Sequence, residues 1–431
     1  MNEKTDHITA VSNAPRANLP GLIENPGAPL QLDRKGWPVC TIENFETAME
    51  WSESLKGVQY NELAQCVEYE LYDRLYRPVI RRWEERDYAM LEKLLESDFG
   101  LYSPQKLRAA LQLFLGTRRY HPIRRRIEAL KWDGTPRLEG FLTRWMGCDD
   151  TPYVREVSRL IFAGGMHRLY QPGCKFDCVP VLVGAQGSGK STLVRWLAIE
   201  DDWFTELTVM EGRESVEQLT GAWICEISEL LALSRVKEQE AVKSYLSRQR
   251  DRYRKPYDRE ITDSPRQCVF IGTTNRRQFL RDKTGNRRFC PVEVGTTGAE
   301  LYARETECRA EILQCWAEAK ARYDEGKLPA SADTALLEDF REAQQDAMEE
   351  DWRVGAIENY VHICPEDHFF CVREVARNAL PYGTEDRARD PTPAESREIA
   401  QILDNIPILK RAGRKRLPSY GQQMSWVRSD V

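Results

Sequence analysis

Several features that would point to particular classes of protein are missing from this 431-residue sequence. No apolar run approaches the length of a membrane-spanning helix, and no charged-then-apolar leader opens the chain. The twelve cysteines are scattered singly, without a Cys-x-x-Cys pair, as is typical of proteins in a reducing compartment. We therefore expect a cytoplasmic protein that does not associate with a membrane.

An overall excess of positive charge is missing too. The formal net charge is −6, so the composition as a whole gives no argument for binding nucleic acid, and any such argument must be local. A zinc site is not indicated either, because the spacing of His362, Cys364, His368 and Cys371 matches no familiar finger.

One stretch predicts a nucleotide site. Residues 184–191 fit the pattern G-x-x-x-x-G-K-[ST] of the phosphate-binding P-loop. The apolar run 179–183 before it is typical of a buried parallel strand, and residues 192–197 after it have helical character. Lys190 would reach the β- and γ-phosphates of ATP, and Ser191 would be a ligand of Mg²⁺. The residues predicted to contact the nucleotide are Gly184, Ala185, Gln186, Gly187, Ser188, Gly189, Lys190, Ser191 and Thr192.

Two further apolar runs end in residues that a nucleotide hydrolase needs. The run 222–229 carries Glu226 and Glu229, and carboxylates there can hold Mg²⁺ and polarise the attacking water. The sequence does not decide which of them holds the metal. A third run ends in Asn275, at the edge where ligands of parallel sheets lie. Asn275 is expected to orient the water or sense the γ-phosphate, with the capping of a turn as the alternative.

Two arginines follow the third run after a turn. A guanidinium that reaches a neighbouring subunit's γ-phosphate stabilises transition-state charge and contributes about 10³ to 10⁵ in rate. Arg287 and Arg288 are therefore candidates for such an arginine finger, and paired surface arginines are the alternative.

The most basic stretch lies between the second and third runs. In residues 243–259 seven basic residues outnumber two acids and alternate with Tyr245, Tyr253 and Tyr257, a mixture suited to phosphate contacts and base stacking. Pro256 and Asp258 indicate a turn, so a hairpin or loop is expected, with a salt-bridged surface helix as the alternative. The predicted DNA contacts are Lys243, Arg248, Arg252, Tyr253, Arg254, Lys255 and Arg259.

The rest of the chain divides into flanking parts around a core over 151–330. Residues 1–40 lack a sustained apolar period and predict a disordered arm or linker. Residues 41–150 predict a helical module, which includes a helix that begins at Ser103-Pro104. Residues 331–431 predict a small C-terminal domain. Its capped helix at Thr392 and the basic hairpin that follows are typical of a winged helix, whose wing and recognition helix can contact DNA.

Together, these motifs resemble those of the virulence-associated protein E family of phage and mobile-element ATPases, which is similar in turn to the superfamily 3 helicases of viral replication. The resemblance covers about residues 120–294. It is carried by Trp132-Asp-Gly-Thr-Pro-Arg-Leu138, Pro172-Gly-Cys-Lys-Phe-Asp177, Trp223-Ile-Cys-Glu-Ile-Ser-Glu-Leu230, Gly272-Thr-Thr-Asn275 and Gly285-Asn-Arg-Arg-Phe289.

The resemblance implies an α/β fold with an AAA+-like P-loop core and a parallel sheet. It further implies Walker B acids at Glu226 and Glu229, a sensor at Asn275, a finger at Arg287 or Arg288, and a hairpin over 243–259 that grips single-stranded DNA in a ring's pore. Two points depart from the pattern. The second strand lacks the adjacent acid pair usual in viral helicases, and unwinding itself has no residue signature. Many relatives carry a primase domain upstream, and here a short start and a helical module take its place, so priming is expected only if a separate primase supplies it.

The leading hypothesis is an oligomeric, hexameric Mg²⁺-dependent ATPase that moves along single-stranded DNA as the replicative helicase of a phage, prophage or other mobile element. An ATP-driven DNA-binding switch or origin-assembly factor, without processive unwinding, is the alternative. A small-molecule P-loop kinase is a third reading.

Overall fold

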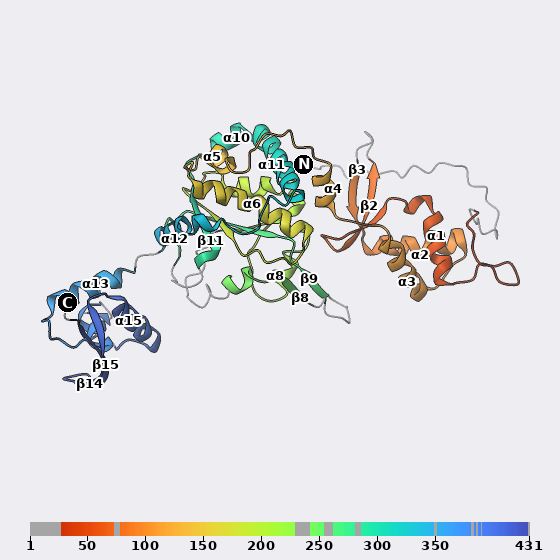
Figure 1. The fold of residues 1–431 in the computed structure, drawn as a ribbon. Helices are drawn as coiled ribbons and strands as arrows, with labels where there is room; N and C mark the ends of the chain where they lie inside the picture. The colour runs from red at the N-terminus through yellow and green to blue at the C-terminus, as the bar shows by residue number, and fades with distance from the viewer. Residues whose placement is uncertain are drawn as a thin grey trace, which may run out of the picture.

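A five-stranded parallel sheet forms the centre of the computed structural model (Figure 1). The strand order is β11-β5-β10-β7-β6, and every neighbouring pair is parallel. The strands are β5 (Val179–Val183), β6 (Phe204–Glu206), β7 (Ile224–Ser228), β10 (Val269–Thr274) and β11 (Phe289–Glu293). Strands β5 and β10 are buried at every position, as their unbroken apolar sequence predicts, so the expected α/β core with a parallel sheet is confirmed. The structure describes residues 27–72, 78–228, 242–253, 262–280, 286–348, 351–380, 383–384, 387–388 and 390–429.

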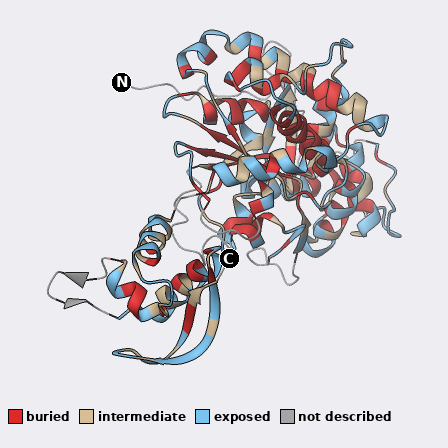
Figure 2. Ribbon diagram, turned by 60° about the vertical axis from the view of Figure 1, so that its left-hand side comes forward, coloured by how far each residue is buried: buried red, intermediate tan, exposed pale blue. Residues whose placement is uncertain are grey.

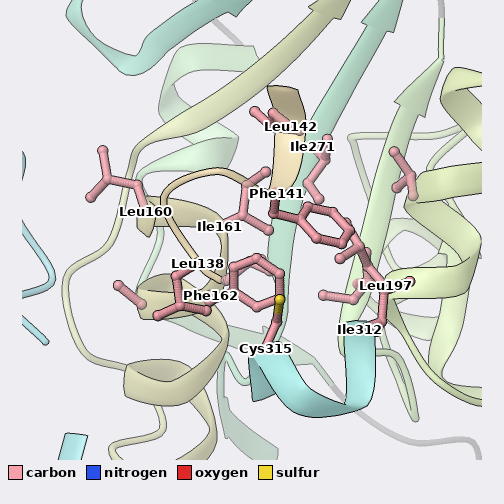
Figure 3. Close-up of a cluster of buried hydrophobic side chains, with 14 of the residues drawn as sticks. Leu138, Phe141, Leu142, Leu160, Ile161, Phe162, Leu197, Ile271, Ile312 and Cys315 are labelled. Carbon is pink, nitrogen blue, oxygen red and sulfur yellow. The ribbon is translucent and has the colours of Figure 1, made fainter. Parts of the chain in front are cut away.

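One face of this sheet is covered by helices that form the main hydrophobic core. Figure 3 shows part of that core, where Phe141 and Phe162 pack edge to face with ring centroids 5.3 Å apart. Ile271 of the sheet strand β10 and Ile312 of helix α11 (Glu305–Asp324) belong to the same cluster. The helices of this layer are α4 (Pro122–Glu128), α5 (Phe141–Met146), α6 (Pro152–Tyr170), α7 (Lys190–Leu197) and α11 (Glu305–Asp324).

The opposite face of the sheet packs against a smaller cluster that includes Leu207, Val242, Tyr245 and Leu246. Figure 2 shows the sheet strands as buried and the outer surfaces of the surrounding helices as exposed. The remaining short elements of the core are η2 (Asp201–Trp203), α8 (Glu214–Glu217), η3 (Asn286–Arg288), α10 (Gly298–Ala303), η4 (Thr334–Leu336) and α12 (Leu337–Asp346), together with the hairpin strands β8 (Arg250–Tyr253) and β9 (Thr262–Pro265).

The N-terminal unit differs from the helical module expected over 41–150. It contains helices, but also a four-stranded sheet of order β3-β2-β1-β4, so it is a mixed unit with its own core. Residues 123–148, moreover, pack into the main core rather than into this unit. The elements are α1 (Ile42–Trp51), η1 (Glu53–Leu55), β1 (Val58–Asn61), β2 (Cys66–Tyr72), β3 (Pro78–Arg82), α2 (Glu85–Phe99), α3 (Pro104–Gly116) and β4 (Arg119–Tyr120). Helix α3 begins at Pro104 after Ser103, as expected.

The C-terminal unit has a separate hydrophobic core that includes Ile357, Phe370, Leu403 and Trp426. Residues 331–346 do not belong to it, because Phe340 packs into the main core. The expected capping box is present, with Thr392 and Glu395 exchanging hydrogen bonds at the start of α15. The elements are α13 (Trp352–Ile363), α14 (Val372–Asn378), β12 (Gly383–Thr384), β13 (Arg387–Ala388), α15 (Pro393–Asn405), β14 (Leu409–Leu417) and β15 (Gly421–Arg428).

Two kinds of feature are missing from the described residues. Within them, no helix has the length and apolar character needed to cross a bilayer. The same residues contain no group of three His, Cys, Asp or Glu side chains arranged to hold a metal ion, and His368 instead contacts the carboxylate of Glu374.

Candidate nucleotide-binding site

The P-loop connects β5 to α7 in the middle of the parallel sheet. Gly187 and Gly189 adopt φ values of +80° and +86°, a left-handed backbone that favours glycine and lets amide groups turn into the loop. The loop is fixed on two sides by its backbone. Gly184 N donates to Thr274 O of β10 at 3.1 Å, and Gly298 N of α10 donates to Gly187 O at 2.8 Å.

Lys190 opens α7 and folds back over the loop. Its Nζ lies 2.8 Å from both Gly184 O and Ala185 O and 3.1 Å from Ser188 Oγ. Burial lowers the pKa of Lys190, while the charge of Glu226 acts in the opposite direction. An ammonium group held only by neutral oxygens inside a loop is poorly compensated, and an anion bound there would supply the missing negative charge.

Ser191 and Glu226 meet at the boundary between α7 and β7. Ser191 Oγ donates to Glu226 Oε1 at 2.5 Å, and Thr273 Oγ1 of β10 donates to the same oxygen at 2.6 Å. Glu226 is only 2% exposed, and burial raises the pKa of its carboxyl against the opposing effect of these two hydrogen bonds. Hydroxyl and carboxylate oxygens are the ligands that Mg²⁺ prefers.

Asn275 directly follows β10 and approaches the same place. Its Oδ1 lies 3.2 Å from Lys190 Nζ, so the amide is beside the loop that would hold phosphates. The structure therefore brings together four of the predicted site residues, Lys190, Ser191, Glu226 and Asn275, which lie in or after three different strands, β5, β7 and β10. Their catalytic roles remain predictions. The other predicted acid, Glu229, lies outside the described residues.

Two residues of the site were not predicted. Thr273 donates a hydrogen bond to Glu226. The only sign of this in the sequence is that a threonine stands two residues before Asn275, near the end of the same apolar run. Glu206 ends β6 directly opposite Glu226 in the strand register, accepts a hydrogen bond from Ser228, and contributes to the raised pKa of Glu226. Strand β6 has only three residues, so no periodic pattern could reveal it.

The two candidate finger arginines have different surroundings. Arg288 is half-buried, donates from Nε to Ser247 Oγ at 2.7 Å and lies 3.7 Å from the Asp177 carboxylate, so it ties neighbouring parts of its own chain together. Arg287 is exposed in η3. Exposure is the property that a finger directed at another subunit needs, which favours Arg287 over Arg288.

The predicted basic hairpin is present as the antiparallel pair β8–β9, which projects from the core (Figure 1). Its root is a buried ion pair: Arg266 Nε and Nη2 donate to Asp251 at 2.6 and 2.9 Å, and both side chains are under 5% exposed. Arg248 and Arg252 are exposed. Arg250 forms an ion pair with Asp263 at 2.9 Å, and Arg252 approaches the same carboxylate at 3.8 Å.

Two residues of the basic stretch need correction. Lys243 is 7% exposed and Tyr245 is fully buried under the sheet, where its hydroxyl donates to Ser215 O at 3.0 Å. Neither side chain can contact DNA in this structure. Tyr245 and Leu246 pack into the hydrophobic cluster below the sheet, so the start of the basic stretch is buried. Tyr253 lies at the end of β8. Arg254, Lys255 and Arg259 lie outside the described residues.

The basic triplet Arg124–Arg126 of α4 also has structural contacts. Arg124 donates from Nε and Nη2 to Leu169 O at 3.0 and 2.7 Å, and Arg125 lies 3.3 Å from the Glu70 carboxylate. These contacts link α4 to α6 and to the N-terminal sheet.

The chain matches a family model and is similar to solved structures. No curated protein matches the chain. Among solved structures, the A form apo structure of the NrS-1 C-terminal region is similar with 13% identity and a TM-score of 0.46, over 86% of this chain and 96% of that one. A second apo structure of the same region gives 15% identity and a TM-score of 0.46, over 87% and 97%. The model of the virulence-associated protein E-like domain matches residues 127–350, which is more than half of the chain and includes the whole P-loop site. The chain therefore belongs to the virulence-associated protein E-like family.

Proposed function

We propose that this chain is a Mg²⁺-dependent ATPase that acts on DNA, and that it works as the ring-forming replicative helicase of a phage, prophage or other mobile element. The observation that carries the proposal is the hydrogen bond between Ser191 of the P-loop and the buried carboxylate of Glu226. A hydroxyl and a carboxylate joined beside a phosphate-binding loop are the two protein ligands that a nucleotide-bound Mg²⁺ requires.

The residues present fit a Mg²⁺–ATP complex. Gly187 has no atom within 4 Å of the place where a Cβ would stand, so the loop is open on that side, and its amides precede a helix N-terminus. Lys190 lies inside the loop with its charge uncompensated by any direct ion pair among the described residues. Ser191 and Glu226 would hold the Mg²⁺, which when bound neutralises charge on the phosphates.

The other site residues would have separate roles in hydrolysis. Lys190 would bind the β- and γ-phosphates, and Asn275, 3.2 Å from it, would orient the attacking water. Exposed Arg287 would reach the nucleotide of the next subunit in a homo-oligomeric ring, which the family resemblance suggests is a hexamer. Glu229 remains a candidate for the second acid.

The projecting hairpin β8–β9 supplies the proposed contact with single-stranded DNA. Exposed Arg248, just before the hairpin, and exposed Arg252 of β8 would bind backbone phosphates, and the buried Arg266–Asp251 pair gives the hairpin a rigid root. A rigid root is needed if movement at the nucleotide is to be transmitted to the DNA.

Strand displacement on a forked DNA substrate tests this proposal against its alternative. A helicase displaces the strand only with Mg²⁺ and ATP, and Arg248→Ala with Arg252→Ala should lose stimulation by single-stranded DNA while keeping basal hydrolysis. A protein that binds and hydrolyses ATP but displaces nothing would be the ATP-driven switch or origin-assembly factor. Full stimulation of the double variant would refute the hairpin assignment.

A further inference from the structure

The C-terminal unit has the element order of a winged helix. Helices α13, α14 and α15 are followed by the hairpin β14–β15, and Phe370, between α13 and α14, bridges to Trp426 of β15 by backbone hydrogen bonds of 2.8 and 2.9 Å. In helix-turn-helix folds the recognition helix, here α15, is the element that enters the major groove. The charges of this unit do not fit that arrangement.

Positive charge is concentrated on the hairpin. Residues 351–408 contain eleven acidic residues and six lysines and arginines, whereas residues 409–428 contain six lysines and arginines and no acid. Helix α15 carries Glu395, Glu398 and Asp404 against Arg397 alone. Glu398 and Asp404 form ion pairs with Arg353 and Arg411, so α15 offers DNA phosphates a single arginine of its own, whereas the hairpin attracts them.

A β-bulge arranges the hairpin arginines on one face. The register pairs Arg411 with Trp426, Arg414 with Met424 and Arg416 with Gln422, and it shifts by one residue between Arg411 and Gly413. Residues opposite each other share a face, so all three arginines lie on the face of Trp426, Met424 and Gln422. Without the extra residue, Arg411 and Arg414 would point to opposite faces.

Two of these arginines have no acidic partner within the described residues. Arg411, nearest the core, donates from Nε to Asp404 Oδ1 at 2.7 Å. Arg414 and Arg416, farther along the hairpin, are exposed and form no ion pair there. Figure 2 shows the far part of this hairpin as exposed. The two guanidinium groups are therefore ready to bind phosphates.

The aromatic residues on and beside the hairpin β14–β15 indicate whether it binds single-stranded or double-stranded DNA. Binding to single strands uses exposed rings on which bases stack. Trp426 is 1% exposed, Tyr420 is half-buried with the Arg377 guanidinium 5.9 Å from its ring, and Phe369 is covered by Lys415 Nζ at 3.3 Å. The exposed Trp352, at 59%, belongs to α13 and not to the hairpin. A narrow ribbon with a row of arginines and no fully exposed ring instead suits a duplex groove and its phosphates.

We propose that the hairpin β14–β15 binds double-stranded DNA through Arg414 and Arg416, and that α15 is not its recognition element. This site is separate from the single-strand contact proposed for β8–β9. It gives the molecule a second DNA-binding site, which does not require bound ATP. It would keep the ATPase core near the duplex ahead of the unwound strand.

Fluorescence anisotropy with the full chain and a short labelled DNA duplex, at about 50 to 200 mM salt, tests the proposal. Because each phosphate contact contributes about 0.9 to the slope of log K against log salt, Arg414→Gln with Arg416→Gln should reduce that slope by about 2. The matched control is Arg397→Gln, which removes the arginine of α15 and should leave duplex binding unchanged. Basal ATP hydrolysis should be unchanged in both variants.

Three results would overturn it: an unchanged slope in the double variant, an equal loss in Arg397→Gln, or a loss seen only with single-stranded DNA or an RNA duplex. The hairpin β8–β9 provides an internal check on the source of binding. Arg248→Ala with Arg252→Ala should leave duplex affinity intact, and if that variant abolishes it, the duplex site lies on the core.

Discussion

Ser191 and Glu226 stand 35 residues apart in the sequence, and Ser191 Oγ donates a 2.5 Å hydrogen bond to Glu226 Oε1. The bond connects the first turn of α7 with the middle of β7, and Thr273 of β10 donates to the same carboxylate oxygen. The position of the carboxylate is therefore set by two neighbouring strands and the P-loop helix, as a preorganised metal site requires.

Glu226→Gln should nearly abolish ATP hydrolysis. The amide keeps the size of the side chain but is a poor Mg²⁺ ligand, and loss of several kcal/mol of transition-state stabilisation corresponds to a fall in kcat of about 10²- to 10³-fold. Steady-state turnover across a Mg²⁺ titration measures the effect. Glu217→Gln, an exposed acid paired with Arg213, is the control and should retain full activity. Equal turnover in the two variants would remove Glu226 from the site.

The stability of the metal-free protein should depend on pH through Glu226. Burial raises the pKa of this carboxyl, so the folded state holds its proton at a pH where the unfolded chain has released it. The contribution of Glu226 is thus lost as pH rises from its ordinary range, near pH 4, through the raised pKa. Glu226→Gln should melt at a higher temperature than the wild type at neutral pH, and this gap should close below about pH 4. A gap independent of pH would contradict the assignment.

The buried ion pair at the root of β8–β9 should be far more important for stability than the exposed one. Asp251→Ala leaves the Arg266 charge buried and should lower the free energy of unfolding by about 3 to 5 kcal/mol. Asp263→Ala removes the exposed partner of Arg250 on the same hairpin and should cost less than about 1 kcal/mol. Urea unfolding of both variants provides the comparison. Similar losses would mean that the root does not hold the hairpin.

Gly298 should be intolerant of a side chain because of its contact with the P-loop. A Cβ there would lie 2.4 Å from Gly187 O, a backbone atom that cannot move without displacing the loop. Gly298→Ala should therefore destabilise the fold by about 1 to 3 kcal/mol and weaken ATP binding. Gly355→Ala, inside α13 with no atom within 4 Å, should instead stabilise by about 0.5 to 1 kcal/mol. Calorimetric unfolding and nucleotide titration distinguish the two.

The geometry of the candidate nucleotide site was largely predictable because its signals are local. The P-loop pattern follows an unbroken apolar strand, and Glu226 and Asn275 occur in or just after two more such strands. Parallel strands buried on both faces have this appearance in any sequence. Thr273 could not be assigned a role, because its contact with Glu226 depends on the order of strands in the sheet, which the sequence does not state.

The N-terminal sheet was missed for a different reason. Its strands are short and rich in charged residues, and β2, Cys66–Tyr72, contains two glutamates. One of these, Glu68, is buried and accepts hydrogen bonds from Asn61 and Tyr120, so the polar positions that alternate with Val67, Tyr69 and Leu71 do not mark a solvent-exposed face. Lys243 and Tyr245 were misassigned because a basic, tyrosine-rich segment has the same composition whether its first turn is buried or exposed.

The most direct test of the account is ATP hydrolysis by the wild type and by Lys190→Ala, with and without single-stranded DNA, over a salt series. We expect wild-type turnover that rises strongly with DNA, a stimulation that fades as salt increases because phosphate contacts release counterions, and loss of turnover in Lys190→Ala. Hydrolysis that persists in Lys190→Ala, or wild-type turnover indifferent to DNA at every salt concentration, would contradict the account.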